Sequence, residues 1–213
     1  MSQRFPAFFS VIALAVALFC GDARAMQATD PSALINDLVN QAIGIIQDKQ
    51  DSPQDREAKF RAMLDTGFDI PRISRFVLGR YWKSANDAQR QQFSKLFEEW
   101  VVRTYSARFT EYSGEKIQVT GTRPESETTT VVLSQFTSPN GAPPAKVEWH
   151  VHKTGDNDYA IVDVSVEGVS MALTQRDEIA AVADRSGGTV DGLNKALEEK
   201  VQTTPTAAPT DNK

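Results

Sequence analysis

The first part of the chain repeats apolar residues at the spacing of an α-helix. Apolar side chains recur every three or four positions over 31–46, over 53–67 and, in a shorter stretch, over 71–78. Pro31 and Pro53 each follow a residue with a short polar side chain, which is typical of a helix start because the first helical residue needs no N–H. We therefore expect three helices here. The buried side of the third is expected to carry Ile73, Phe76 and Val77.

A fourth predicted helix carries a heavy aromatic stripe. Ser84 and Asp87 match a capping box, in which the two side chains accept hydrogen bonds from backbone N–H groups at the helix start, and Gly114 offers a stop. The stripe consists of Phe93, Leu96, Phe97, Trp100, Val101, Tyr105, Phe109 and Tyr112. So much aromatic surface on one helix has to be buried, either in a core or against a ligand.

After Gly114 the hydrophobic period changes from that of a helix to that of a strand. Strands are expected at Lys116–Gly121, Thr128–Phe136, Ala145–Lys153 and Tyr159–Glu167. Two further helices are expected at Met171–Asp184 and Thr189–Val201, separated at Gly187-Gly188. The sequence therefore predicts an α+β fold, with a helical N-terminal half packed on a curved antiparallel sheet and closing C-terminal helices.

Strict alternation assigns the faces of the strands. On the third strand one face carries Val147, Trp149 and Val151, and the other carries Lys146, Glu148, His150 and His152. On the fourth strand Ala160, Val162, Val164 and Val166 lie opposite Ile161, Asp163 and Ser165. On the second strand we take the face with Val131 and Leu133 as the inner one. A slip of one residue would exchange the two faces.

Residues 1–25 match a cleavable signal peptide. Arg4 precedes an apolar run over 7–20, and Ala23-Arg24-Ala25 has the small-x-small pattern of a cleavage site. Cleavage there removes Cys20, so the exported chain cannot form a disulfide. Residues 26–201 are expected to form one domain, and Gln202–Lys213 a disordered tail.

Composition and missing motifs exclude several classes of function. The formal net charge is −5, which does not favour non-specific nucleic-acid binding. There is no G-x-S-x-G nucleophile motif and no glycine-rich phosphate loop. His150 and His152 share a strand face with Glu148, but no further ligand at a suitable spacing completes a metal site. Asp163 and Glu167 would act as an acid–base pair only in a cleft. We expect no enzyme, no metal and no cofactor.

One basic segment interrupts the acidic chain. No acidic residue occurs between Ile70 and Asn86, where the chain carries Arg72, Arg75, Arg80 and Lys83. This segment is either a solvated helix face or a dock for a lipid phosphate or an acidic partner.

The order of short motifs in the chain resembles that of a known family. These positions are Leu78, Gly79 and Trp82, then Gln89, Arg90 and Phe93, then Thr104 and Tyr105 at the end of the helix. A second match runs from Asp163 to Arg176 (D-V-S-V-E-G-V-S-M-A-L-T-Q-R). The pattern resembles the periplasmic lipid-binding proteins of the toluene-tolerance or MlaC type, over about Pro31 to Val201. The V-S-M-A-L-T-Q-R wording, with Gly187-Gly188 after it, is similar to the branch associated with hopanoid biosynthesis.

The resemblance implies a periplasmic carrier with a deep apolar cavity between sheet and helices, which shuttles a phospholipid or a hopanoid between membranes. It implies two partners, an inner-membrane ABC transporter with an MCE component and an outer-membrane lipid-transfer complex. From the helix we expect the cavity to be lined by Phe97, Trp100, Val101 and Tyr105. From the sheet and the turn after it we expect Val131, Leu133, Val147, Trp149, Val151, Val162, Val164, Val166, Val169 and Met171.

Two alternatives remain open from the residues alone. A small enzyme acting on an apolar substrate would need Asp163 or His150 to point into the cavity with a perturbed pKa. An adaptor protein would have a filled core without a cavity of lipid size and would bind a membrane complex through its basic segment. The cargo, the direction of transport, the oligomeric state and the trigger for release do not follow from the sequence.

Overall fold

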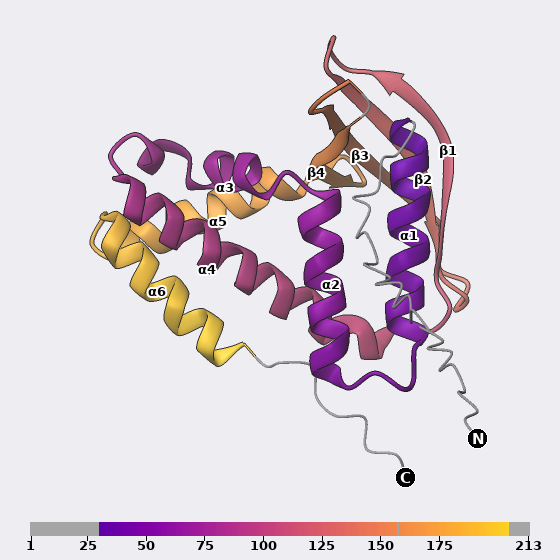
Figure 1. The fold of residues 1–213 in the computed structure, drawn as a ribbon, viewed down its shortest axis with the longest axis horizontal. Coiled ribbons are helices and arrows are strands. Elements are labelled where there is room, and N and C mark those ends of the chain that lie inside the picture. The colour runs from indigo at the N-terminus through magenta and orange to yellow at the C-terminus, as the bar shows by residue number, and fades with distance from the viewer. Residues whose placement is uncertain (1–29, 157, 205–213) are drawn as a thin grey trace, which may run out of the picture.

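A computed structural model describes residues 30–156 and 158–204. The predicted signal peptide and most of the predicted tail lie outside these residues. The helices are α1 (Pro31–Gln47), α2 (Pro53–Gly67), α3 (Ile70–Leu78), α4 (Asp87–Ser106), α5 (Met171–Arg185) and α6 (Val190–Thr203), with 3₁₀ turns η1 (Gly79–Trp82) and η2 (Ala107–Glu111). The strands are β1 (Lys116–Pro124), β2 (Thr129–Thr137), β3 (Ala145–Lys153), β4 (Tyr159–Val166) and β5 (Val169–Ser170). The α+β prediction is confirmed (Figure 1).

The start of α4 differs from the prediction. The capping box is formed by Asn86 and Gln89, whose side chains each accept the other residue's backbone N–H at 2.9 Å. Ser84 instead donates its hydroxyl to the carbonyl of Tyr81 at 3.1 Å. The reason is η1, which follows α3 directly and keeps Lys83 in the αR conformation, whereas Asn86 has the extended backbone of a helix cap (φ −79°, ψ 172°). The helix then ends at Ser106 and tightens into η2, eight residues before the predicted stop at Gly114.

The strands form a single antiparallel sheet in the order β1-β2-β3-β4-β5. Trp149 on β3 pairs with Val132 on β2 and with Val164 on β4, which puts these three side chains on the face toward α1 and α2. The inner face of β2 is therefore the one with Val132, and the prediction for Val131 and Leu133 is wrong by one residue. That slip reverses every side chain of the strand.

A β-bulge breaks the alternation predicted for β4. The register between β3 and β4 shifts between His150 and Val151, so that Val151 lies opposite Ile161. Ile161 is fully buried, whereas Ala160, which alternation had placed on the inner face, is only half-buried. The link between α2 and α3 is fastened to this strand, because the backbone N–H of Asp69 donates to the carbonyl of Ile161 at 2.9 Å.

The described residues form two hydrophobic cores. The first joins α3, η1, α4, α5 and α6, and the second joins α1 and α2 to the inner face of the sheet. Figure 1 shows the corresponding arrangement, with α1 and α2 beside the sheet and the other helices grouped on the far side of α2. Val101 of α4 packs against both cores. None of the helices in the described part of the chain is long and apolar enough to cross a membrane.

Candidate functional site

A cavity of about 480 Å³ lies where the two cores meet. Its wall is almost entirely apolar and is formed by α1 to α5, by the sheet and by the segments that connect them. From α1, α2 and the link to α3 it takes Leu38, Val39, Ala42, Ile43, Ile46, Phe60, Met63, Leu64 and Phe68. From the remaining helices it takes Ile70, Ile73, Phe97, Val101, Tyr105, Tyr112, Met171, Ala172 and Gln175, and from the sheet and its approach Glu115, Ile117, Phe136, Trp149, Val162, Asp163, Val164 and Val166.

Eight of the residues expected at a cavity are on this wall. Three of them lie on the inward side of α4, four lie on the inner faces of β3 and β4, and one lies at the start of α5. They are Phe97, Val101 and Tyr105, then Trp149, Val162, Val164 and Val166, then Met171.

Two residues that were expected on the cavity wall lie elsewhere, because of the elements that carry them. Trp100 is buried in the helical core, where the Nζ of Lys200 on α6 lies 4.4 Å from the centroid of its ring. The aromatic stripe of α4 is wider than the cavity, and this side of it packs against α6. Val169 is 58% exposed because β5 has only two residues and begins directly after a tight turn.

Four more expected residues lie in the sheet but away from the cavity. Val131 and Leu133 are on the opposite face of β2, as the slip of one residue requires. Val147 and Val151 are on the inner face of β3 and both are buried, but neither of them lines the cavity. The cavity therefore reaches only the middle of β3, at Trp149.

The contribution of α1 and α2 was missed. Their apolar stripes are evident in the sequence, and the stripe of α1 includes Leu38, Val39, Ala42, Ile43 and Ile46. Periodicity identifies the buried face of a helix but does not distinguish packing against a neighbour from lining a cavity. That distinction depends on how α1, α2 and the sheet meet, which only the fold supplies.

The few polar groups on the wall are either hydrogen-bonded within the protein or uncharged. Burial raises the pKa of the Tyr105 phenol, which therefore stays protonated well above neutral pH. Asp163 accepts the N–H of Val164 at 2.8 Å and of Ala172 at 2.9 Å on one oxygen, and the hydroxyl of Ser170 at 2.5 Å on the other. Its carboxylate thus fixes the turn from β4 into α5 with both oxygens.

The other candidate groups for chemistry lie outside the cavity. Glu167 sits in the β4–β5 turn, where it accepts the backbone N–H of Lys146, so it does not pair with Asp163. His150 is on the outer face of the sheet, 3.1 Å from Glu125. In the described part of the chain no three His, Cys, Asp or Glu side chains gather in a way that would hold a metal ion.

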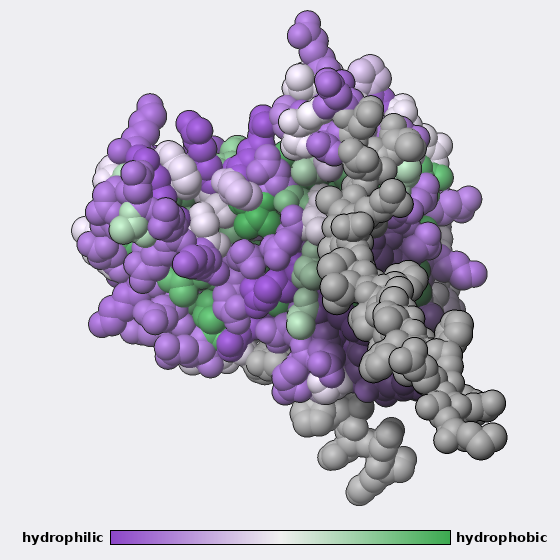
Figure 2. Space-filling model, viewed as in Figure 1, coloured by the Kyte–Doolittle hydropathy of each residue, from purple (hydrophilic) through white to green (hydrophobic). Residues whose placement is uncertain are grey.

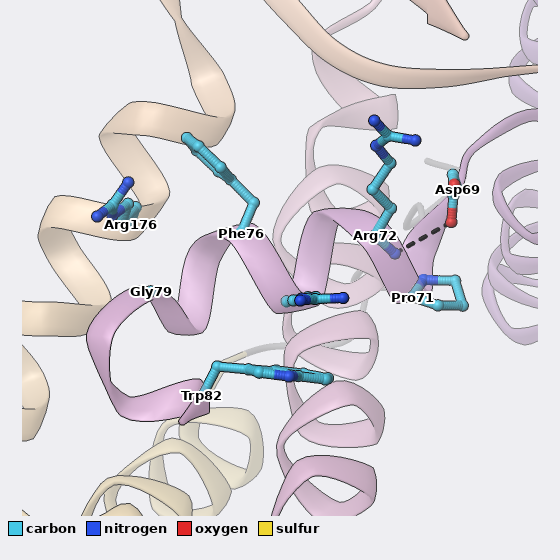
Figure 3. A pocket seen from close by; sticks show the side chains of 8 residues that line it. Asp69, Pro71, Arg72, Phe76, Gly79, Trp82 and Arg176 are labelled. Carbon is cyan, nitrogen blue, oxygen red and sulfur yellow. Dashed lines mark hydrogen bonds between the residues drawn. The ribbon is translucent and has the colours of Figure 1, made fainter. Parts of the chain in front are cut away.

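The predicted basic segment divides into two parts. Arg72 and Arg75 line a surface groove of about 910 Å³ outside α3, together with Arg176 of α5 (Figure 3). Arg80 instead pairs with Asp184 at 2.6 Å and is not among the residues that line the groove. The remaining lining residues are Asp69, Pro71, Phe76, Gly79 and Trp82. Lys83 is exposed and does not line the groove.

Comparison with known proteins identifies the family of this chain. The family model described as MlaC protein matches residues 36–199, most of the chain. The chain belongs to the MlaC family. This MlaC-family chain is 23% identical over 172 residues to the intermembrane phospholipid transport system binding protein MlaC of Haemophilus influenzae, covering 77% of this chain and 79% of that protein.

A solved structure has the same fold. It is the phospholipid-binding protein from Ralstonia solanacearum in complex with a phospholipid, with a TM-score of 0.70 and 23% sequence identity. The match covers 82% of this MlaC-family chain and 98% of the other. The family assignment made from the motifs is thereby confirmed. Nothing in these matches distinguishes the branch associated with hopanoid biosynthesis.

Proposed function

We propose that this chain is a periplasmic lipid carrier, which holds the acyl part of a phospholipid in the cavity and moves it between the inner and the outer membrane. The observation that carries the proposal is the cavity itself. Its volume of about 480 Å³ lies within the roughly 300–1,000 Å³ of pockets that enclose small ligands, and its wall is nearly all hydrocarbon. Membership of the MlaC family and the phospholipid bound to the structural neighbour support the same assignment.

The energy of burial agrees with such a cargo. Each methylene removed from water contributes about 0.8 kcal/mol, so a 16-carbon chain contributes on the order of 12 kcal/mol before the cost of ordering it. A lipid can therefore stay bound while it crosses an aqueous space. Uptake and release then require a membrane partner that competes for the same apolar surface. We propose as partners an inner-membrane ABC transporter with an MCE component and an outer-membrane lipid-transfer complex.

The alternatives have less support. An enzyme would need a free acid or base on the cavity wall, and both oxygens of Asp163 are used in fixing a turn. An adaptor would have a filled core, and the cavity removes that premise. A carrier needs no catalytic group, only a dry space that can be opened.

The test is native mass spectrometry of the exported protein purified from the periplasm of the bacterium that makes it, with lipid extraction of the same sample. The expected result is about one phospholipid per chain. A hopanoid at that stoichiometry would keep the carrier and change its cargo. Protein that carries no lipid and takes up none from added phospholipid vesicles would overturn the proposal.

A further inference from the structure

The most exposed apolar side chains of the described residues gather in one region. They come from α3, from the β4–β5 hairpin and from the start of α5, and they are Phe76 (43% exposed), Val166 (38%), Val169 (58%) and Leu173 (48%). Val166 pairs with Val169 across the hairpin, and Leu173 lies one helical turn further along the chain. We call these four residues the apolar patch. Figure 2 shows apolar surface in the hydrophilic face over α3 and α5. Such a patch marks a site of interaction.

Three arginines beside the apolar patch have no carboxylate partner. Arg72, Arg75 and Arg176 are exposed and line the groove outside α3, and none of them takes part in an ion pair with any residue in 30–156 or 158–204. Neighbouring arginines differ, since Arg80 is paired with Asp184 and Arg90 with Asp87. The groove is therefore a local concentration of positive charge on a chain whose formal net charge is −5.

Two of these arginines are held in place by aromatic rings. The guanidinium of Arg176 lies 5.2 Å from the ring centroid of Phe76, and that of Arg75 lies 5.8 Å from the ring centroid of Trp82 (Figure 3). Gly79 makes room for the first contact, because a Cβ at this position would lie 3.0 Å from Nε of Arg176. A guanidinium beside an aromatic ring still presents its planar fork of donors, which favours two-point binding of a carboxylate.

The apolar patch continues into the cavity. Val166 belongs to both, and Met171, which lines the cavity, is two residues before Leu173. Helix α3 separates the groove from the cavity, since its Ile70 and Ile73 line the cavity while Arg72 and Arg75 line the groove. Anything seated on the apolar patch and the groove would also cover this edge of the cavity.

We infer that the apolar patch and the groove form one docking surface for a partner protein whose contact area has an apolar centre and a rim of carboxylates. The inference rests on the proposed carrier function, because a carrier has to present its cavity to the protein that fills or empties it. Aromatic, aliphatic and arginine side chains around an apolar centre are the composition of a protein–protein interface. A bare anionic membrane is a poorer occupant, since three arginines attract it weakly and the acidic chain as a whole is repelled.

The test places the photoreactive residue p-benzoylphenylalanine at position 173 of the full chain in the bacterium that makes it, and identifies cross-linked products by mass spectrometry. The same experiment is repeated with Arg75→Glu and Arg176→Glu together, and with Lys195→Glu as the control. Lys195 is exposed on α6 and has no ion pair with the described residues. For every variant, the phospholipid that the purified, delipidated chain takes up from added phospholipid vesicles is also measured.

The expected result is a cross-link to a cell-envelope protein that drops about tenfold on the double reversal and is unchanged in the control. The purified partner should then bind the original chain and not the reversed one, and a carboxylate-to-arginine change on the partner should restore binding. Uptake of phospholipid from vesicles by the purified, delipidated chain should be the same in all variants, which separates this surface from the lipid-binding cavity.

Four outcomes would overturn the inference. They are no cross-link, a cross-link that ignores the charge reversal, a cross-link to a second copy of this chain, and a cross-link to lipid alone. In the last case flotation with vesicles of phosphatidylethanolamine and phosphatidylglycerol, lost on the double reversal, would assign the surface to the membrane.

Discussion

The indole Nε1 of Trp149 donates a hydrogen bond to Oγ of Ser134 at 2.9 Å, and that hydroxyl donates to the carbonyl of Val147 at 3.1 Å. This relay crosses from β3 to β2 on the inner face of the sheet. It fixes the one large ring that β3 presents to the cavity, and it satisfies a polar N–H in an otherwise apolar wall.

The first prediction concerns this relay. Ser134→Ala should lower the free energy of unfolding by about 1–2 kcal/mol, because the indole N–H is left without a partner. In a Trp149→Phe background, which has no indole N–H, the same change should cost less. Urea unfolding of the four proteins of this double-mutant cycle measures the difference. Equal costs in both backgrounds would show that the hydrogen bond does not stabilise the fold.

A second prediction concerns the volume of the cavity. Ala42→Trp on α1 should fill part of the space and reduce bound phospholipid more than tenfold, since losing room for two methylenes removes about 1.6 kcal/mol of affinity. Asn36→Trp, at an exposed position of the same helix, is the control and should keep its lipid. Lipid extraction and quantification measure the phospholipid bound to both proteins, and circular dichroism shows whether they fold. Equal lipid in the two would mean that the cargo lies elsewhere.

A third prediction contrasts two glycines. Gly79→Ala should destabilise the protein by about 1–3 kcal/mol, because Gly79 has φ +57° and ψ −124°, a conformation that residues with a Cβ avoid. Gly44→Ala should stabilise it by about 0.5–1 kcal/mol, since a Cβ there meets nothing within 4 Å in the middle of α1. Thermal unfolding of both variants checks the opposite signs. A stable Gly79→Ala protein would contradict the backbone argument.

The fourth prediction is a pH dependence. Burial raises the pKa of Glu99, but the hydrogen bonds and charges of Arg103 and Arg61, each at 2.6 Å, outweigh it and hold that pKa below its usual value. A lowered pKa in the folded state contributes stability above the unfolded value of about 4.3, and that stability is lost as the pH falls through the folded value.

Glu99→Gln should therefore cost about 1–2 kcal/mol at pH 7 and progressively less as the pH falls below 4. Glu198→Gln, at an exposed position of α6, is the control and should change stability little at either pH. Urea midpoints measured from pH 7 down to pH 3 test the prediction. A difference that persists unchanged at pH 3 would place its origin outside this charge network.

The helices and strands were predictable because their signals are local. Asp30, Ser52 and the apolar periods after them identify α1 and α2 directly, and both residues cap their helices as expected. The cap of α4 was misplaced because Ser84, Asn86 and Asp87 all suit the role. The choice among them depends on where η1 ends, which no local pattern states.

The cavity wall was less predictable because it depends on which alternate residues of each strand face inward and on how the helices pack. One extra residue on β4, Val162, lies opposite the junction of His150 and Val151 on β3 and reverses the alternation of β4 beyond it. Phe76 has helical spacing with Ile73 and Val77, yet it is exposed beside Arg176, because α5 covers only part of that face. Such outcomes are set by contacts between distant segments.

The position of the cavity between two cores affects how its selectivity for cargo can change by substitution. Its volume is set by the way the two cores meet around Val101. Fully buried residues such as Leu34 and Phe93 hold each core together without lining the cavity. Substitutions at partly buried wall residues such as Val39 and Ala42 can reshape the compartment while the fully buried residues keep both cores packed, so selectivity for cargo can change at a small cost in stability.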